Sequence, residues 1–101
     1  RGTVMKYSEL RQSLRDRKKQ WCVYLVECKG GSYYCGITND IDRRISEHNS
    51  GKGAKYTKSR RPVKLLASVE VKDRSTALKL EAAVKKKRKQ DKISFLVSHS
   101  A

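Results

Sequence analysis

Three residue types that suit phosphate chemistry fall within one short stretch of the chain, residues 33–49. Tyr34 can move a proton, whereas Arg44 and His48 can neutralise charge that develops on a phosphate. On a helix beginning near residue 39 or 40, Arg44 and His48 are four residues apart and point to one side. The aromatic run before Gly36 predicts a strand, and we expect the chain to turn at this glycine. A phenol at the end of that strand should therefore lie close to the guanidinium and the imidazole.

The preceding segment predicts the first two strands. Residues 21–28, WCVYLVEC, are rich in aromatic and β-branched residues and contain no Gly or Pro, which is typical of a strand. The turn signal KGGS follows, so a second strand at 32–37 should pair antiparallel to the first. Alternation places Tyr24 on one face with Cys22 and Val26, opposite its two chain neighbours.

The remaining elements follow from caps and periodicity. Asp40 and Gly51 suit the two ends of the helix that carries Arg44. A Gly-rich basic loop spans 50–62, a third strand is expected at 63–71, and Asp73 should cap a helix over 74–89. A last short helix should follow residue 90. The order β-β-α-β-α-α predicts an α+β domain with a small, mainly antiparallel three-stranded sheet flanked by helices.

The charge balance favours a polyanionic partner. The 101 residues carry 25 Lys and Arg against 10 acids, a formal charge of +15. Such an excess points first to nucleic acid and second to an anionic membrane, the plain alternative being a solvated basic surface without a partner. The expected phosphate-backbone contacts are the cations of the 50–62 loop: Lys52, Lys55, Lys58, Arg60 and Arg61. Tyr56 in the same loop could stack on a base or anchor the loop.

Length and cysteine spacing exclude several classes. The chain is one domain long, with no apolar run near the ~18 residues of a membrane span and no signal-peptide pattern. Its three cysteines lack zinc-like spacing, so we expect reduced thiols and a cytoplasmic protein. Residues 1–20 are expected to form a basic arm or weak helix, and residues 21–98 the folded domain. Met5 is a candidate native start.

One acidic residue stands out in the helix after Asp73. Ala77, Leu80 and Val84 form an apolar stripe, and Glu81 lies on that stripe. A carboxylate facing the core is costly unless a partner or cation meets it. Glu81 is thus either a metal ligand or the partner of a nearby Lys or Arg.

These residues together resemble the GIY-YIG nuclease domain. The first family motif is represented by residues 22–24 and the second by 34–36, so its two tyrosines correspond to Tyr24 and Tyr34. The family's arginine, ten residues after the second tyrosine, corresponds to Arg44, and His48 follows four residues later. The resemblance covers about residues 21–97 and is strongest to small, stand-alone bacterial members. It implies that Glu81 is the metal-binding residue on the later helix.

The resemblance implies a metal-dependent endonuclease that hydrolyses DNA phosphodiester bonds. Glu81 would hold one divalent ion, Mg²⁺ with Mn²⁺ as the alternative, with waters completing the shell. We assign the proton from water to Tyr24 and the orientation of phosphate or water to Tyr34, although the residues alone allow the reverse. Arg44 would clamp the phosphate, and His48 would hold it or assist proton transfer. The DNA could be branched or single-stranded, no membrane partner is expected, and a protein partner could supply specificity.

Departures from the family pattern motivate a second hypothesis. Cys22 replaces the first-motif glycine, Ile37 stands where some larger relatives have a basic residue, and an asparagine found after the metal helix has no match. A binding module that kept the fold but cuts poorly would also explain the high positive charge. A basic protein that docks on RNA or the ribosome is the third alternative, but it gives Glu81 no reason to lie in an apolar stripe.

Overall fold

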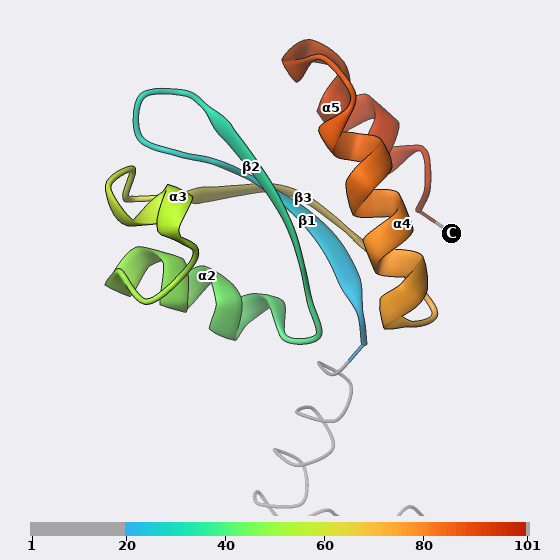
Figure 1. The fold of residues 1–101 in the computed structure, drawn as a ribbon, viewed down its shortest axis with the longest axis horizontal. Coiled ribbons are helices and arrows are strands. Elements are labelled where there is room, and N and C mark those ends of the chain that lie inside the picture. The colour runs from blue at the N-terminus through green and yellow to red at the C-terminus, as the bar shows by residue number, and fades with distance from the viewer. Residues whose placement is uncertain (1–19, 101) are drawn as a thin grey trace, which may run out of the picture.

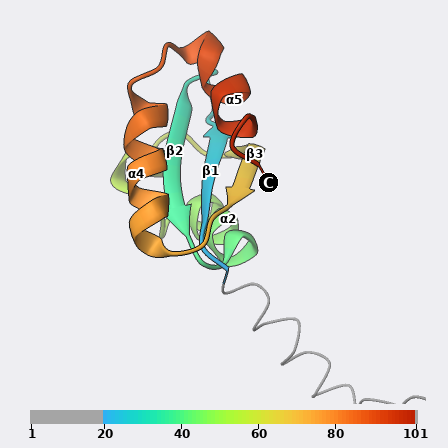
Figure 2. The same ribbon diagram turned by 90° about the vertical axis from the view of Figure 1, so that its right-hand side faces the viewer.

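Three antiparallel strands form the central layer of the protein. The structure, a computed structural model, describes residues 20–100. The strands β1 (Cys22–Glu27), β2 (Tyr33–Thr38) and β3 (Lys64–Glu70) are arranged in the order β2-β1-β3. β1 lies in the middle and pairs antiparallel with both neighbours (Figure 2). The predicted hairpin and three-stranded sheet are confirmed.

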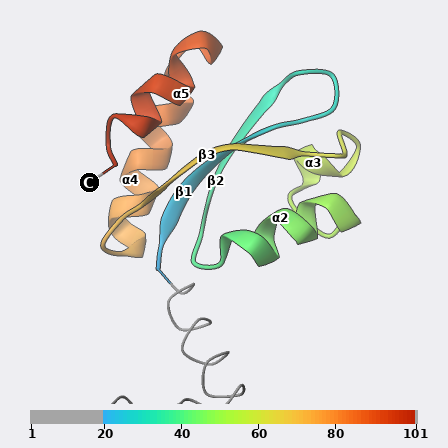
Figure 3. The same ribbon diagram turned by 180° about the vertical axis from the view of Figure 1, so that it is seen from behind.

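Helices cover the two faces of this sheet (Figures 1 and 3). α2 (Ile41–Ser50) and the short α3 (Lys55–Lys58) lie on one side. α4 (Arg74–Lys85) and α5 (Lys89–Val97) lie on the other, where α4 packs mainly on β2 and α5 on β3. The α+β class predicted from the sequence is therefore confirmed.

Strand alternation divides the core into two clusters. Val23 and Leu25 point toward α4 and α5, where they pack with Leu80, Val84 and Leu96. The cluster on the other face is smaller: Tyr24, Val26, Cys28 and Val63 are buried there, with Tyr34, Ile41 and Ile45 packed against them. The predicted orientation of Tyr24 is confirmed, and α2 packs on this face of the sheet through Ile41 and Ile45.

Capping residues fix where the two longer helices begin. The carboxylates of Asp40 and Asp73 accept hydrogen bonds from the backbone N–H groups of Arg43 and Thr76, at 3.2 and 2.8 Å. Each contact satisfies an N–H group that has no partner within its helix. Gly51 ends α2 with φ of 85°, a left-handed conformation that glycine adopts without strain. These positions match the sequence prediction.

Two predicted boundaries were wrong. The 50–62 loop contains α3, whose Thr57 hydroxyl donates to the carbonyl of Ala54. The helix expected over 74–89 ends at Lys85 and a separate helix begins at Lys89. The Lys92 ammonium donates to the Val84 and Lys85 carbonyls at 3.0 and 3.2 Å, which satisfies the end of α4 in place of a further turn.

Other predictions concern the ends and the compartment. The basic arm proposed for residues 1–20 lies, except for Gln20, outside the described residues. Cys22, Cys28 and Cys35 are buried free thiols. Within residues 20–100, no helix combines the length and apolar character needed to cross a bilayer.

Candidate active site

The hydroxyl of Tyr24 is the centre of a buried polar network. Its oxygen lies 2.8 Å from Nε2 of His48, and Nε of Arg44 donates to it at 3.3 Å. The Tyr24 and His48 side chains are fully buried, whereas Arg44 remains partly exposed. Arg44 and His48 lie one turn apart on α2, and the side of the helix that carries them faces Tyr24 of β1. Within residues 20–100 both side chains form hydrogen bonds with the Tyr24 hydroxyl and neither forms one with Tyr34, the tyrosine predicted to lie beside them.

Gly36 allows the Tyr24 ring to reach this position. It lies opposite Tyr24 in the β1–β2 register, in the middle of β2 and not at a turn as predicted. A Cβ atom at this glycine would lie 2.5 Å from the Tyr24 hydroxyl oxygen and 2.7 Å from Cζ. The ring therefore lies across the edge strand, in space that any side chain at position 36 would occupy.

The second nitrogen of His48 identifies its tautomer. Nδ1 lies 2.7 Å from Oγ1 of Thr57, and that hydroxyl already donates its hydrogen to the Ala54 carbonyl at 2.9 Å. Thr57 must then accept, so Nδ1 carries the proton and Nε2 is free to accept the proton of Tyr24. Sequence reasoning missed Thr57, because nothing in its spacing of nine residues from His48 indicates contact.

The loop after α2 closes over the imidazole. A Cβ atom at Gly53 would lie 2.8 Å from Cα of His48, so only glycine lets the loop backbone pass this close. The side chain of Asn49 holds the far end of the loop by accepting from Val63 N–H at 2.7 Å and donating to its carbonyl at 3.2 Å. The loop thereby excludes water from His48.

Burial and charge set the protonation states. Burial raises the pKa of the Tyr24 phenol to about 12, although the hydrogen bond and charge of Arg44 act in the opposite direction. Burial, and then the nearby Arg44 charge, lowers the pKa of His48. At neutral pH the network therefore consists of a neutral phenol, a neutral imidazole and a charged guanidinium.

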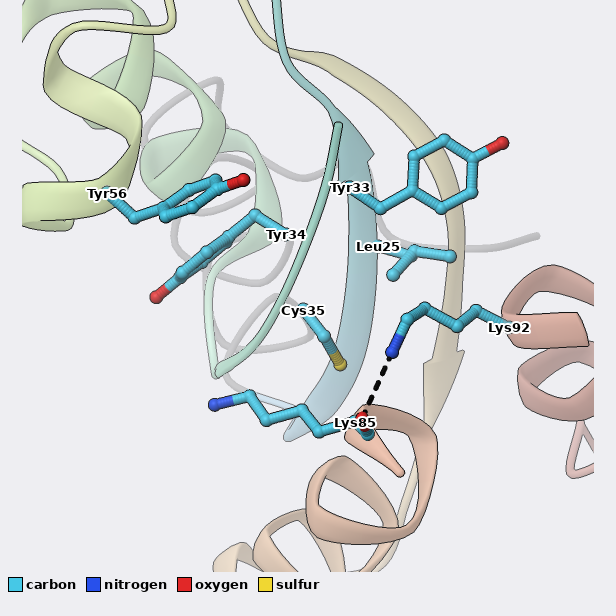
Figure 4. A pocket seen from close by; sticks show the side chains of 7 residues that line it. All are labelled: Leu25, Tyr33, Tyr34, Cys35, Tyr56, Lys85 and Lys92. Atoms are coloured by element: carbon cyan, nitrogen blue, oxygen red, sulfur yellow. Dashed lines mark hydrogen bonds between the residues drawn. The ribbon is translucent and has the colours of Figure 1, made fainter. Parts of the chain in front are cut away.

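Tyr34 lies beside this network through ring contacts. Its ring centroid is 5.5 Å from that of His48 and 6.4 Å from that of Tyr24. On its outer side it stacks on Tyr56 at 5.9 Å (Figure 4). The guanidinium of Arg60 lies over the Tyr56 ring at 3.9 Å. Because both neighbours engage the Tyr56 ring, the structure favours the loop-anchoring interpretation of this residue over base stacking.

Glu81 lies on α4, on the opposite face of the sheet from the Tyr24 ring. Its side chain is 18% exposed and forms an ion pair with Lys85 at 3.4 Å. Burial, and then the Glu81 carboxylate, raises the pKa of Cys35 in β2 to about 11. Among residues 20–100, Glu81 makes no hydrogen bond or ion pair with the Tyr24 network.

The predicted basic loop divides into two kinds of cation. The arginines are tied to the loop: Arg60 donates to the Tyr56 carbonyl at 2.7 Å, and Arg61 to that of Lys58 at 2.9 Å. The three lysines, Lys52, Lys55 and Lys58, are exposed. A second basic group, residues 85–89, runs from the last residue of α4 to the first residue of α5. Lys85 and Lys92 also line a hollow with Tyr33 and Tyr34 between the two groups (Figure 4).

Comparisons with known proteins show which family this chain belongs to. The model of the GIY-YIG catalytic domain matches residues 20–94. The chain belongs to the GIY-YIG family. It is 50% identical over 78 residues to a UPF0213 protein of Cupriavidus pinatubonensis, covering 77% of this chain and 87% of that one. It is 44% identical over 77 residues to a UPF0213 protein of Streptococcus agalactiae, covering 76% and 88%. A solution structure of the UPF0213 protein BH0048 from Bacillus halodurans is 40% identical with a TM-score of 0.49, covering 81% of this chain and 87% of that one.

Membership of the GIY-YIG family carries a general function. The matched domain is a catalytic domain of nuclease type, so its substrate is nucleic acid, and nucleases of this family generally depend on a divalent metal. Every residue of the Tyr24 network, and Glu81, lies within the matched range.

The donor atoms of this GIY-YIG chain fit one metal type better than others. Residues 20–100 hold no cluster of three or more His, Cys, Asp or Glu side chains, as a structural zinc site would need. Glu81 is a single, partly exposed carboxylate on α4, the helix that packs on the edge strand β2. Mg²⁺ keeps several waters and needs only one or two carboxylates, so Glu81 fits such an ion.

Proposed function

We propose that this GIY-YIG protein is a metal-dependent endonuclease that hydrolyses DNA phosphodiester bonds. One observation carries the proposal: the Tyr24 hydroxyl lies between a neutral imidazole nitrogen that can accept its proton and a guanidinium that can stabilise its oxygen. A phenol with a pKa of about 12 is not ionised at neutral pH, so it needs such an acceptor to act as a base.

The proposed proton path begins at the attacking water. Its proton passes to the Tyr24 oxygen while the Tyr24 proton passes to Nε2 of His48, and the resulting hydroxide forms the new P–O bond. The Thr57 contact supports this role, because it keeps the other His48 nitrogen protonated. With both nitrogens engaged and the ring buried, proton transfer is favoured over phosphate binding for His48. After the ester P–O bond breaks, the leaving oxygen takes a proton from solvent and His48 releases its own through Tyr24.

Arg44 is proposed to connect substrate binding to this path. Its guanidinium now contacts Tyr24 and, at 3.2 Å, the Glu47 carboxylate. The Tyr24 side chain is fully buried, and Arg44 is its partly exposed hydrogen-bond partner, so movement of Arg44 is the proposed route by which water reaches the hydroxyl. A phosphate would attract Arg44 away from Glu47, which both clamps the phosphate and uncovers the phenol.

Glu81 and Tyr34 complete the proposed centre. Glu81 would hold Mg²⁺ or Mn²⁺, which when bound supplies charge stabilisation for the phosphate oxygens. Binding at Glu81 competes with the Lys85 ion pair. Tyr34, partly exposed beside His48, would orient the phosphate or water, and the exposed lysines of the 50–62 loop would contact neighbouring phosphates.

A cleavage screen with matched variants tests the proposal. Supercoiled, linear, single-stranded and branched DNA are incubated with Mg²⁺ or Mn²⁺, and cut products are quantified for wild type, Tyr24→Phe, Glu81→Ala and Tyr33→Phe. Removing a general base should lower the rate about 10²- to 10⁴-fold in Tyr24→Phe. The Tyr33 ring packs against the cluster formed with α4 and α5 and has the Lys89 ammonium over it at 4.7 Å; Tyr33→Phe keeps this ring and should cut normally. No cleavage of any DNA by wild type, or full activity in Glu81→Ala, would exclude this mechanism.

A second candidate is a nucleic-acid-binding module that cuts poorly. The +15 charge and the Lys85 contact that already neutralises Glu81 favour it. In that case DNA affinity should fall steeply with salt, while Arg44→Ala and Glu81→Ala change it little. Affinity that does not respond to salt would argue against this function.

A further inference from the structure

A groove lies beside the Tyr24 network at the end of β2. It has a volume of about 400 Å³ and runs from Trp21 and Arg74 past Asn39 to Arg43, Arg44 and Glu47. The start of β1, the end of β2 and the first turn of α4 meet here (Figure 1). Since Arg44 belongs both to this groove and to the Tyr24 network, a ligand in the groove would adjoin the proposed scissile phosphate.

Trp21 and Arg74 form one wall of the groove and are less closely packed than the Arg60–Tyr56 pair. Arg74 lies over the Trp21 ring with its guanidinium carbon 5.9 Å from the ring centroid, whereas Arg60 contacts the Tyr56 ring at 3.9 Å. A stacked base occupies about 3.4 Å, so a base between indole and guanidinium needs a separation of about 7 Å. The separation between Trp21 and Arg74 is therefore about 1 Å too small for a base. Arg74 is exposed and makes no ion pair within residues 20–100, so no ion pair holds it against the ring.

The charge of the groove suits a phosphate next to that base. It contains the guanidinium groups of Arg43, Arg44 and Arg74 against one carboxylate, Glu47. Glu47 pairs with Arg43 at 3.6 Å and with Arg44 at 3.2 Å, so an anion already bridges two of the arginines. A phosphate can replace a carboxylate in this bridge, because arginine binds both groups in the same planar geometry.

We infer that this groove binds one unpaired nucleotide adjacent to the cleaved bond, with its base between Trp21 and Arg74 and its phosphate at Arg43. The inference rests on the proposed nuclease function, which it deepens by assigning a subsite for a flanking base. A paired base is stacked on both sides by its neighbours, so only an unstacked nucleotide can enter.

Trp21 makes this subsite directly measurable, because it is the single tryptophan of the chain. Its fluorescence is titrated in EDTA, so that nothing is cut, with a thymidine octamer and with an abasic octamer of equal charge. We expect saturable quenching by the thymidine octamer and none by the abasic one. A duplex carrying one bulged thymidine should quench, and the same duplex without the bulge should not.

Variants separate stacking from general attraction. With a fluorescein-labelled thymidine octamer, Trp21→Ala should lower affinity about tenfold or more, the usual effect of removing a stacking residue. Arg74→Ala should lower it more than Arg88→Ala, the matched exposed arginine at the α4–α5 turn. Circular dichroism confirms that each variant is folded.

The outcomes distinguish this inference from the proposed function. Equal quenching by thymidine and abasic octamers, equal quenching by the bulged and intact duplexes, or equal losses in Arg74→Ala and Arg88→Ala would overturn the subsite even if the protein cuts DNA. Base-dependent quenching by a protein that cuts nothing would support the subsite while excluding the nuclease mechanism.

Discussion

The two faces of β1 are equally buried but are stabilised differently. Val23 and Leu25 pack in an apolar cluster with side chains from α4 and α5, while Tyr24 on the other face contributes a phenol to a network with His48 and Thr57. Within residues 20–100 no buried side-chain nitrogen or oxygen lacks a hydrogen-bond partner. The stability that the apolar face supplies therefore depends on how well its side chains fill the core volume. On the polar face, the proposed chemistry depends on each hydrogen-bond partner of the network being present.

The largest effect on stability is expected on the apolar face. Leu96 of α5 is fully buried, and Leu96→Ala leaves a cavity that should lower the free energy of unfolding by about 2–5 kcal/mol. Urea denaturation measures this loss. Cleavage per folded molecule at low temperature should stay at the wild-type rate, and a loss of that rate would show that the two faces are not independent.

A smaller effect is expected where the polar face depends on one glycine. Gly36→Ala places a methyl group on the Tyr24 ring and should lower the free energy of unfolding by about 1–3 kcal/mol. Cleavage should fall as well, because the hydroxyl moves away from His48. In a Tyr24→Ala background the same substitution should cost much less, and an equal cost in both backgrounds would mean that the ring is not the obstacle.

His48 should make the stability of the polar face depend on pH. Burial lowers its pKa in the folded protein below the ordinary 6.5, so the unfolded chain binds the proton first. Stability from this group is complete above pH 6.5 and is lost as the pH falls toward the folded value, by at most about 1.4 kcal/mol per pH unit. Urea titrations between pH 7.5 and 5 measure the slope. His48→Asn should reduce it, and a slope that this substitution leaves unchanged would contradict the assignment to His48.

The smallest expected effect lies at the exposed rim of the polar face. Glu47→Gln removes the carboxylate that pairs with Arg43 and Arg44. Exposed ion pairs are worth about 0.2–1 kcal/mol, so phosphate contacts freed from this competition should tighten DNA binding about two- to fivefold. Fluorescence anisotropy at low salt measures the change. Unchanged or weaker binding would show that these arginines do not contact the backbone.

The sequence predicted one of these faces better than the other. Apolar periodicity located the strands and the α4 stripe, because burial of apolar side chains depends on regular spacing. Helical spacing also placed Arg44 and His48 on one side of a helix, but next to Tyr34; Tyr24, their hydrogen-bond partner, was assigned to the site only through the family resemblance. The sequence could not predict the partner of His48, since Thr57 reaches the ring only through the path of a loop, nor the role of Gly36, which depends on the register of two strands. The break after Lys85 likewise depends on a lysine seven residues later.

The segment between Asn49 and Val63 forms a structural unit distinct from the sheet. Its two ends are joined by hydrogen bonds to one amide side chain, as in a compact Ω-loop. Such a segment can be exchanged between relatives, with new lengths and new surface side chains, while the sheet stays unaltered. Any such exchange would have to retain Gly53 and Thr57, because both contact the His48 imidazole. The side chains that this segment presents to solvent can therefore change without disturbing the surroundings of the imidazole.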